Sequence, residues 1–209
     1  MKMNKYNLIE SYLDEEVGSP KCFLDYNKDY ELLIAIVLSA QTTDERVNSV
    51  TKVLFNKYKS LEELKNANLL DLESIIKPIG TYHKKSIFIK EISTELVDKY
   101  NSLVPTNRSK LERLPGVGRK TVNVYLAEIH KIPQFPVDTH INRISKRLDL
   151  AKEEDDVKKV EEKLKRKFKR DNWIKLHHQI ILFGRVRCKA INPICDGCKL
   201  KDICKYYSK

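Results

Sequence analysis

Long apolar stretches are absent from this chain of 209 residues. No run approaches the ~20 apolar residues that a helix needs to span a bilayer. The first residues turn polar and acidic by Asp14, Glu15 and Glu16, without the apolar segment of a signal peptide. We therefore expect a cytoplasmic protein in which thiols stay reduced.

Convincing period-two alternation, repeats of 20 to 50 residues and Gly/Ser-rich linkers are also missing. Apolar residues instead recur at helical spacing, for example over 47–58 and 87–97. Residues 31–40 are apolar on nearly all sides, which indicates a helix at the centre of a globular core. The sequence predicts an all-helical protein whose lobes, if there are two, are joined by short connections near Pro133 and Pro136.

Charge of one sign predominates, because 40 Lys and Arg face 29 Asp and Glu and leave a net charge of +11. This balance favours a polyanionic partner such as nucleic acid. Charge alone is also compatible with a ribosomal or membrane-surface protein, so the partner has to come from motifs.

Four of the five cysteines lie within seventeen residues, in the spacing C-x6-C-x2-C-x5-C: Cys188, Cys195, Cys198 and Cys204. In a reducing compartment such a group indicates metal ligands rather than disulfides. Zinc ribbons usually have two C-x2-C knuckles, and here there is one. The spacing favours a 4Fe-4S cluster over zinc, with Lys189 among the cations that such a loop presents to a DNA backbone. Cys22 stands alone and is expected to be a small buried residue.

Residues 114–120 read L-P-G-V-G-R-K. We expect a short helix carrying Leu111 and Leu114, a stop at Pro115, and a glycine turn into a helix that begins near Arg119. Such a helix-hairpin-helix leaves amides at a helix N-terminus, where they bind phosphate without reading sequence. The alternative is a plain corner between two helices.

Lys120 and Asp138 are the candidate catalytic residues. Lys120 lies in the first turn of the second hairpin helix, where the helix dipole and Arg119 favour loss of its proton and hence a nucleophilic amine. A phosphate contact is the alternative. Asp138 precedes a second helical pattern, so it is either an N-cap or a carboxylate that takes up a proton in amine chemistry. His140 is either a packed polar residue or part of the site.

Taken together, these segments resemble the endonuclease III family of helix-hairpin-helix DNA glycosylases. The resemblance is carried by residues 38–44 (L-S-A-Q-T-T-D), the hairpin 114–120, residues 137–140 (V-D-T-H) and the four-cysteine tail. Their order and separation match the family over nearly the whole chain. A capped helix corner is the alternative for the first segment, because Thr43 or Asp44 can cap the next helix.

The resemblance implies a two-lobed, all-α helix-hairpin-helix glycosylase fold. One lobe, 22–134, is a six-helix barrel with the hairpin, and the other, 1–21 with 135–209, is a helical domain with the 4Fe-4S cluster loop. Double-stranded DNA containing oxidised pyrimidines or abasic sites would lie across the cleft between them. We expect a monomer associated with the nucleoid through DNA.

The resemblance also implies a bifunctional glycosylase and abasic-site lyase. Lys120 attacks C1′ of a damaged nucleotide such as thymine glycol, and the resulting Schiff base permits β-elimination 3′ to the abasic site, with Asp138 assisting. Gln41 fills the gap left by the extruded base, and a second loop wedges the opposite strand. Thr81 stands there where the family often has leucine, which puts that wedge in doubt. The remaining expected DNA contacts are Gly116, Val117, Gly118, Arg119, His140 and Lys189.

Three rival functions remain at this point. Adenine glycosylase relatives lack the hairpin lysine and carry a further C-terminal domain, so Lys120 and an end at Lys209 speak against them. A thymine-mismatch glycosylase shares the scaffold. A non-catalytic DNA-binding protein would need neither Lys120 nor Asp138, and both are present.

Overall fold

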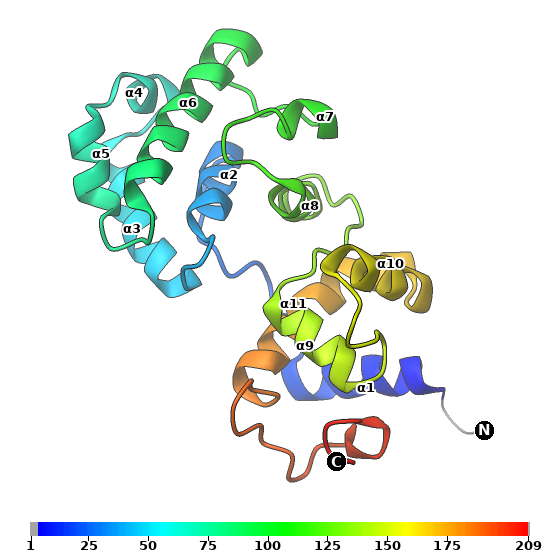
Figure 1. Ribbon diagram of the computed structural model, residues 1–209. Helices are drawn as coiled ribbons and strands as arrows, with labels where there is room; N and C mark the ends of the chain where they lie inside the picture. The colour runs from blue at the N-terminus through cyan, green and yellow to red at the C-terminus, as the bar shows by residue number, and fades with distance from the viewer. Residues whose placement is uncertain (1–3, 209) are drawn as a thin grey trace. The chain divides into compact units, whose positions relative to one another are not determined.

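A computed structural model of the protein describes residues 4–208 and contains only helices, turns and loops in that range (Figure 1). The helices are α1 Lys5–Val17, α2 Asp29–Leu38, α3 Asp44–Lys57, α4 Leu61–Asn66, α5 Leu69–Ile76, α6 Tyr82–Tyr100, α7 Arg108–Leu111, α8 Arg119–Glu128, α9 Thr139–Arg147, α10 Val157–Lys167 and α11 Trp173–Val186, with short 3-10 turns η1 Arg170–Asn172 and η2 Lys201–Ile203. The predicted all-α class is confirmed.

The chain divides into two compact units. The hairpin unit is Cys22–His130, and the cysteine unit combines the residues up to Lys21 with those from Lys131 on. The sequence predicts a division after residue 134, close to Pro133 and Pro136.

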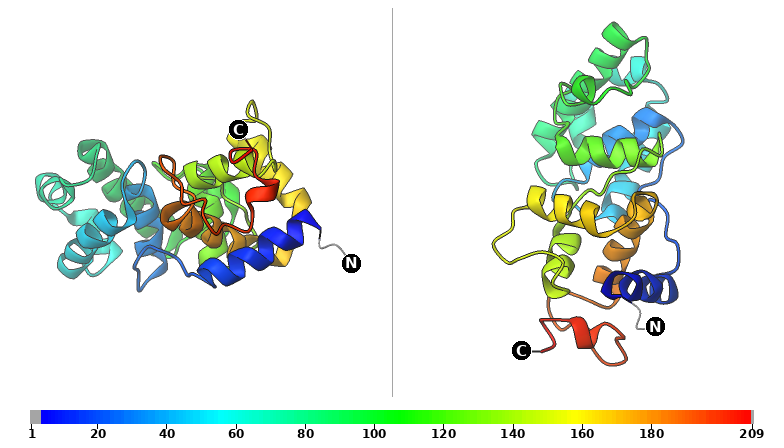
Figure 2. Two further views of the ribbon diagram at one scale, coloured as in Figure 1. Left: turned by 90° about the horizontal axis from the view of Figure 1, so that it is seen from below. Right: turned by 90° about the vertical axis from the view of Figure 1, so that its right-hand side faces the viewer.

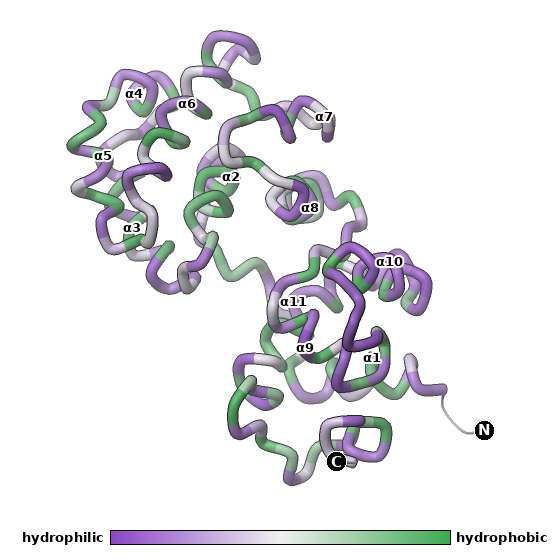
Figure 3. Tube along the Cα trace, in the orientation of Figure 1, coloured by the Kyte–Doolittle hydropathy of each residue, from purple (hydrophilic) through white to green (hydrophobic). Residues whose placement is uncertain are grey.

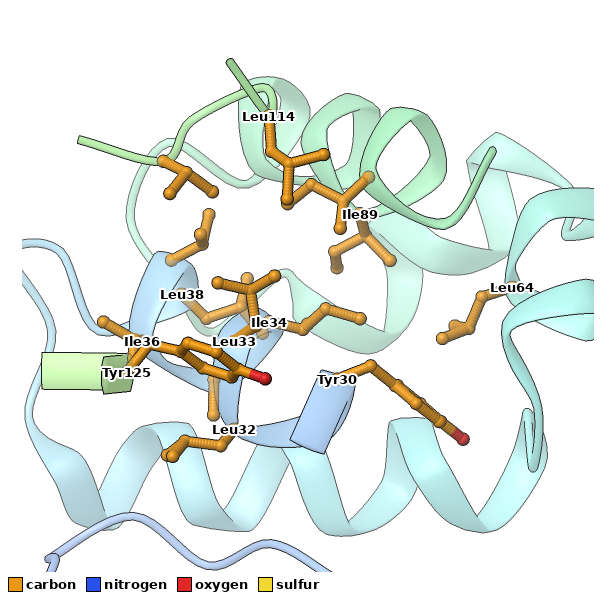
Figure 4. Packing of buried hydrophobic residues seen from close by; sticks show 14 of the residues in the cluster. Tyr30, Leu32, Leu33, Ile34, Ile36, Leu38, Leu64, Ile89, Leu114 and Tyr125 are labelled. Carbon is orange, nitrogen blue, oxygen red and sulfur yellow. The ribbon is translucent and has the colours of Figure 1, made fainter. Parts of the chain in front are cut away.

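The hairpin unit contains α2 to α8 and is built around α2. Nine of the ten α2 residues are buried, from Tyr30 to Leu38, as the apolar run 31–40 predicts. The tube of α2 is correspondingly apolar in Figure 3. Figure 4 shows its side chains in one cluster with Ile89 of α6, Leu114 of the hairpin and Tyr125 of α8. The hairpin is therefore packed against the core of this unit through Leu114.

The cysteine unit joins both ends of the chain. Helix α1 packs along α11, which also packs against α9 (Figure 2). Trp173 donates from its indole to the Phe168 carbonyl, and Gln179 of α11 donates to Asp14 and to the Gly18 carbonyl. The charged segment 153–170 contains α10. Of the residues of this helix, Val160, Glu161 and Leu164 are buried.

No helix within residues 4–208 has both the length and the apolar character required to cross a membrane.

Candidate functional site

The hairpin is a chain of short turns between α7 and α8. Leu114 donates its amide to the Leu111 carbonyl at 3.1 Å, and Val117 donates to the Leu114 carbonyl at 3.1 Å. Helix α7 ends at Leu111, so the expectation that Leu114 belongs to it is wrong: Leu114 lies in the following turn, where its side chain is 2 % exposed. Buried Leu111, Leu114 and Val117 anchor the hairpin to the core.

Gly118 is the N-cap of α8 and, as a glycine, offers no side-chain acceptor to the first turn. The first amides of an α-helix have no partner inside the helix. Most other helices of the described chain begin with a side-chain cap, such as Ser60 on α4 and Asp156 on α10. Gly118, Arg119 and Lys120 are all exposed. The start of α8 can therefore offer its amides and its dipole to an external phosphate.

Gly116 has a φ of +72° and lies directly on an aromatic ring. A Cβ atom added there would stand 2.5 Å from Cδ2 of Phe88, a half-buried residue of α6. Lys84 of the same helix places Nζ 5.4 Å from the centre of that ring. Helix α6 thus supports the hairpin from below through Phe88. At position 116 only glycine can adopt the left-handed conformation and also fit against that ring.

Exchanging the two hairpin glycines for alanine should give different results. Gly116→Ala is expected to lower the free energy of unfolding by about 1–3 kcal/mol and to weaken DNA binding, because it combines left-handed strain with a clash. Gly118→Ala is the matched control, since its φ is −97° and nothing lies within 4 Å of an added Cβ. Urea unfolding and DNA titration of both variants measure this. Equal losses of stability and of DNA binding in the two variants would contradict the proposed support of Gly116 by Phe88.

Two exposed loops of the hairpin unit carry the residues expected to enter DNA. Gln41 follows α2 and Thr81 precedes α6, and each has a φ of +58°. A left-handed conformation is uncommon for residues other than glycine and is unusual for a β-branched threonine. Thr43 caps α3 through Oγ1, which accepts from the Arg46 amide at 3.4 Å, so the capped-corner interpretation of residues 41–44 holds at Thr43.

Asp138 is the N-cap of α9 in the cysteine unit. Its Oδ1 accepts from the Ile141 amide at 2.8 Å, which leaves Oδ2 outside the cap, and the residue is half-buried. His177 of α11 lies with Nδ1 2.9 Å from the Pro136 carbonyl and so steadies the segment that leads to Asp138.

His140 is packed within the cysteine unit. Arg143 lies with Nη2 3.2 Å from its Nδ1, and Gly184 of α11 permits the close approach of the ring. Burial lowers the pKa of His140, with Arg143 and Arg185 acting in the same direction and Asp138 opposing them. His140 is therefore a half-buried side chain held between Arg143 and α11.

The four cysteines of the tail line one pocket together with Arg147, Phe183 and Leu200. Arg147 lies with Nη1 3.3 Å from Sγ of Cys188 and also donates to the carbonyls of Lys189 and Ala190. Arg143 donates to the Cys188 carbonyl at 2.9 Å. Burial raises the pKa of the Cys188 thiol, while Arg147 opposes that shift. Two arginines of α9 thus hold the loop, and the Lys189 side chain is exposed.

A single zinc ion is one group that the four sulfurs could ligate. Four thiolates around one zinc, each at ~2.3 Å, lie about 3.8 Å from one another. Within residues 4–208 no three His, Cys, Asp or Glu side chains are grouped to ligate one ion. The four cysteines nevertheless line one pocket, and burial together with the neighbouring Cys198 raises the pKa of Tyr12. By their chemistry, four cysteine thiolates are a ligand set that a 4Fe-4S cluster uses.

Helix α1 buttresses the same loop. Glu16 accepts from Nε of Arg187 at 2.5 Å, and Glu15 pairs with Lys199 at 2.5 Å. The acidic stretch near the N-terminus therefore neutralises cations around the cysteines.

The sequence interpretation missed several supporting residues. Lys85 and Phe88 of α6 support the two exposed loops and the hairpin, and Arg143 and Arg147 of α9 hold the cysteine loop. Lys85 had a usable signal, because it precedes Ile89, Ile92 and Leu96 at inward helical spacing. The arginines carried none, since a basic residue on an amphipathic helix is ordinarily exposed.

The family model described as HhH-GPD superfamily base excision DNA repair protein matches residues 34–170. Endonuclease III of Haemophilus influenzae is 42% identical over 99% of this chain and 99% of its own length. Endonuclease III of Bacillus subtilis is 43% identical over 88% of this chain and 84% of its own. A solved structure of a trapped endonuclease III–DNA covalent intermediate, an estranged-adenine complex, has a TM-score of 0.91 at 41% identity and covers 99% of this chain and 98% of that one.

Proposed function

We propose a substrate for this chain, which belongs to the endonuclease III family of the HhH-GPD superfamily of base excision DNA repair proteins. The proposed activity is the removal of oxidised pyrimidines of the thymine glycol type from duplex DNA. The chain acts as a DNA glycosylase with abasic-site lyase activity. The observation that carries the proposal is the glycine-capped start of α8, where Lys120 stands exposed two residues beyond Gly118. There a phosphate-binding element and an amine occupy the same turn.

In the proposed reaction the Lys120 amine donates its lone pair to C1′ of the damaged nucleotide, and the bond from C1′ to the base breaks with its electrons. The sugar ring opens to an imine on Lys120. Loss of a proton from C2′ then expels the 3′ phosphate by β-elimination. The damaged base must first leave the stack, because C1′ is shielded within a duplex, and extrusion costs a few kcal/mol.

Asp138 supplies the proton acceptor in this proposal. Because Oδ1 is held by the Ile141 amide, the carboxylate has a fixed orientation and Oδ2 is available for a proton. Gln41 enters the duplex from its exposed loop, and Thr81 contacts DNA from the second loop. Gly116, Val117, Gly118 and Arg119 hold the backbone. Lys189 and His140 complete the expected DNA contacts, His140 through Nε2 because Nδ1 faces Arg143.

We further propose that Cys188, Cys195, Cys198 and Cys204 hold a 4Fe-4S cluster. When bound, the cluster would cross-link the loop that carries Lys189 through the four cysteines. Its contribution would be structural. The shared pocket and the contacts of the α9 arginines with Cys188 support this. Iron and acid-labile sulfide analysis of the purified protein tests it, with about four of each per chain expected. One zinc per chain would overturn the cluster and leave the glycosylase proposal intact.

Borohydride trapping of the wild-type protein tests the function itself. Duplexes with thymine glycol or an abasic site are expected to give a covalent adduct, and undamaged duplex is expected to give none. An adduct with a G·T mismatch but not with thymine glycol would replace the proposed substrate by a mismatched thymine. Tight binding without any adduct would indicate a monofunctional glycosylase or a mere DNA-binding protein.

A further inference from the structure

The side chain of Lys85 is buried inside the hairpin unit. The residue is 4 % exposed, and its Nζ donates to the carbonyls of Leu38 at 3.0 Å and Ala40 at 2.7 Å. Within the described chain this ammonium has no carboxylate partner, and burial lowers its pKa. A buried cation without a counter-ion is costly. An apolar side chain would avoid that cost but would leave the carbonyls of Leu38 and Ala40 without this donor, so the reason for a lysine here lies in these two carbonyls.

The two acceptors belong to the end of α2. Leu38 is the last residue of that helix, and Ala40 directly precedes Gln41. The last carbonyls of a helix lack partners within it and carry the negative end of the dipole. The Lys85 ammonium bonds to one such carbonyl, that of Leu38, and to the Ala40 carbonyl two residues beyond the helix. It thereby fixes the chain just before Gln41 turns into its left-handed conformation.

The backbone of Lys85 bonds to the second loop. Lys85 lies one helical turn after Thr81, and its amide donates to the Thr81 carbonyl at 3.1 Å. Thr81 Oγ1 donates to the Gly80 carbonyl at 2.6 Å, which stabilises its left-handed backbone. One residue therefore bonds to both exposed loops, through its side chain to one and through its backbone to the other.

We propose that Lys85 is a positioning residue that holds the Gln41 loop in register with the Thr81 loop, so that both are ordered before a base is extruded. The inference rests on the proposed function and adds a residue that touches neither DNA nor the reacting atoms. Two left-handed residues on exposed loops are favoured only when their surroundings hold them. Helix α6 provides that support, since it also carries Phe88 under the hairpin glycine.

The test compares Lys85→Met with Lys90→Met. Lys90, on the same helix, donates from Nζ to the carbonyl of Ala67, the C-cap of α4, at 2.6 Å. The two lysines thus make the same kind of bond, but only Lys85 reaches the loops. Lys85→Met is expected to slow single-turnover excision of thymine glycol by about 10- to 100-fold, because small misplacements of positioning groups have effects of that size. Lys90→Met should stay within about twofold.

A second readout separates positioning from general loss of structure. The fluorescence of 2-aminopurine opposite the lesion reports the filling of the gap, and it is measured for Lys85→Met, for Gln41→Ala and for the double variant. If Lys85 acts through Gln41, Lys85→Met has little further effect in the Gln41→Ala background. Should Lys85→Met not fold, Lys85→Gln, which keeps one amide donor, goes through the same cycle.

Additive effects of Lys85→Met and Gln41→Ala, or an equal loss in Lys90→Met, would overturn the inference. Wild-type trapping distinguishes this failure from failure of the proposed function. If the wild type forms no adduct, the function fails; if it forms the adduct and Lys85→Met excises at the wild-type rate, the positioning inference alone fails.

Discussion

Lys120→Ala is expected to abolish the borohydride-trapped adduct and strand cleavage, with DNA affinity retained within a few-fold. The methyl group cannot form an imine, whereas the hairpin amides remain in place for the phosphate. The adduct is measured on an abasic duplex by gel electrophoresis, and affinity on the same duplex without borohydride.

Lys120→Arg is the matched control because it keeps the positive charge. A guanidinium stays protonated at physiological pH and does not act as the amine nucleophile. If Lys120 only contacts a phosphate, arginine restores activity; if Lys120 is the nucleophile, both variants are inactive. Trapped adduct in Lys120→Ala would place the nucleophile elsewhere.

Asp138→Asn is expected to slow base excision by about 100-fold or more while the fold is unchanged. Asparagine caps a helix about as well as aspartate, so the bond to the Ile141 amide survives. What is lost is the carboxylate that takes up a proton, and general acid–base groups contribute about 100-fold or more to a rate. Single-turnover excision and urea unfolding measure the two effects separately.

Asp156 provides the control for capping. It caps α10 in the same unit, with Oδ1 accepting from the Lys159 amide at 2.7 Å, and the proposed mechanism does not use it. Asp138→Ala and Asp156→Ala should each lose about 1 kcal/mol of stability as caps. Only the Asp138 variants should lose excision per folded molecule. A loss of stability without loss of excision at Asp138 would reduce its role to capping.

Short segments of the sequence predict much of the local structure. The glycines of 114–120, the cap at Asp138 and the apolar run of α2 predict their conformations because each depends on neighbours a few residues away. The same locality explains the error at Leu114, since helical spacing continues for one turn after the hydrogen-bonded helix has ended at Leu111.

The sequence by itself also determined the family, because motif order and spacing carry it, and hence the candidate pair Lys120 and Asp138. Only the tertiary structure decided what supports the exposed loops and the hairpin. Lys85 lies 47 residues from Leu38, and Phe88 lies 28 residues before Gly116. Such contacts arise when α6 packs across the core, and no local pattern states which carbonyl a buried ammonium reaches. The sequence names the groups that react, whereas the packing of α6 holds the loops that surround them.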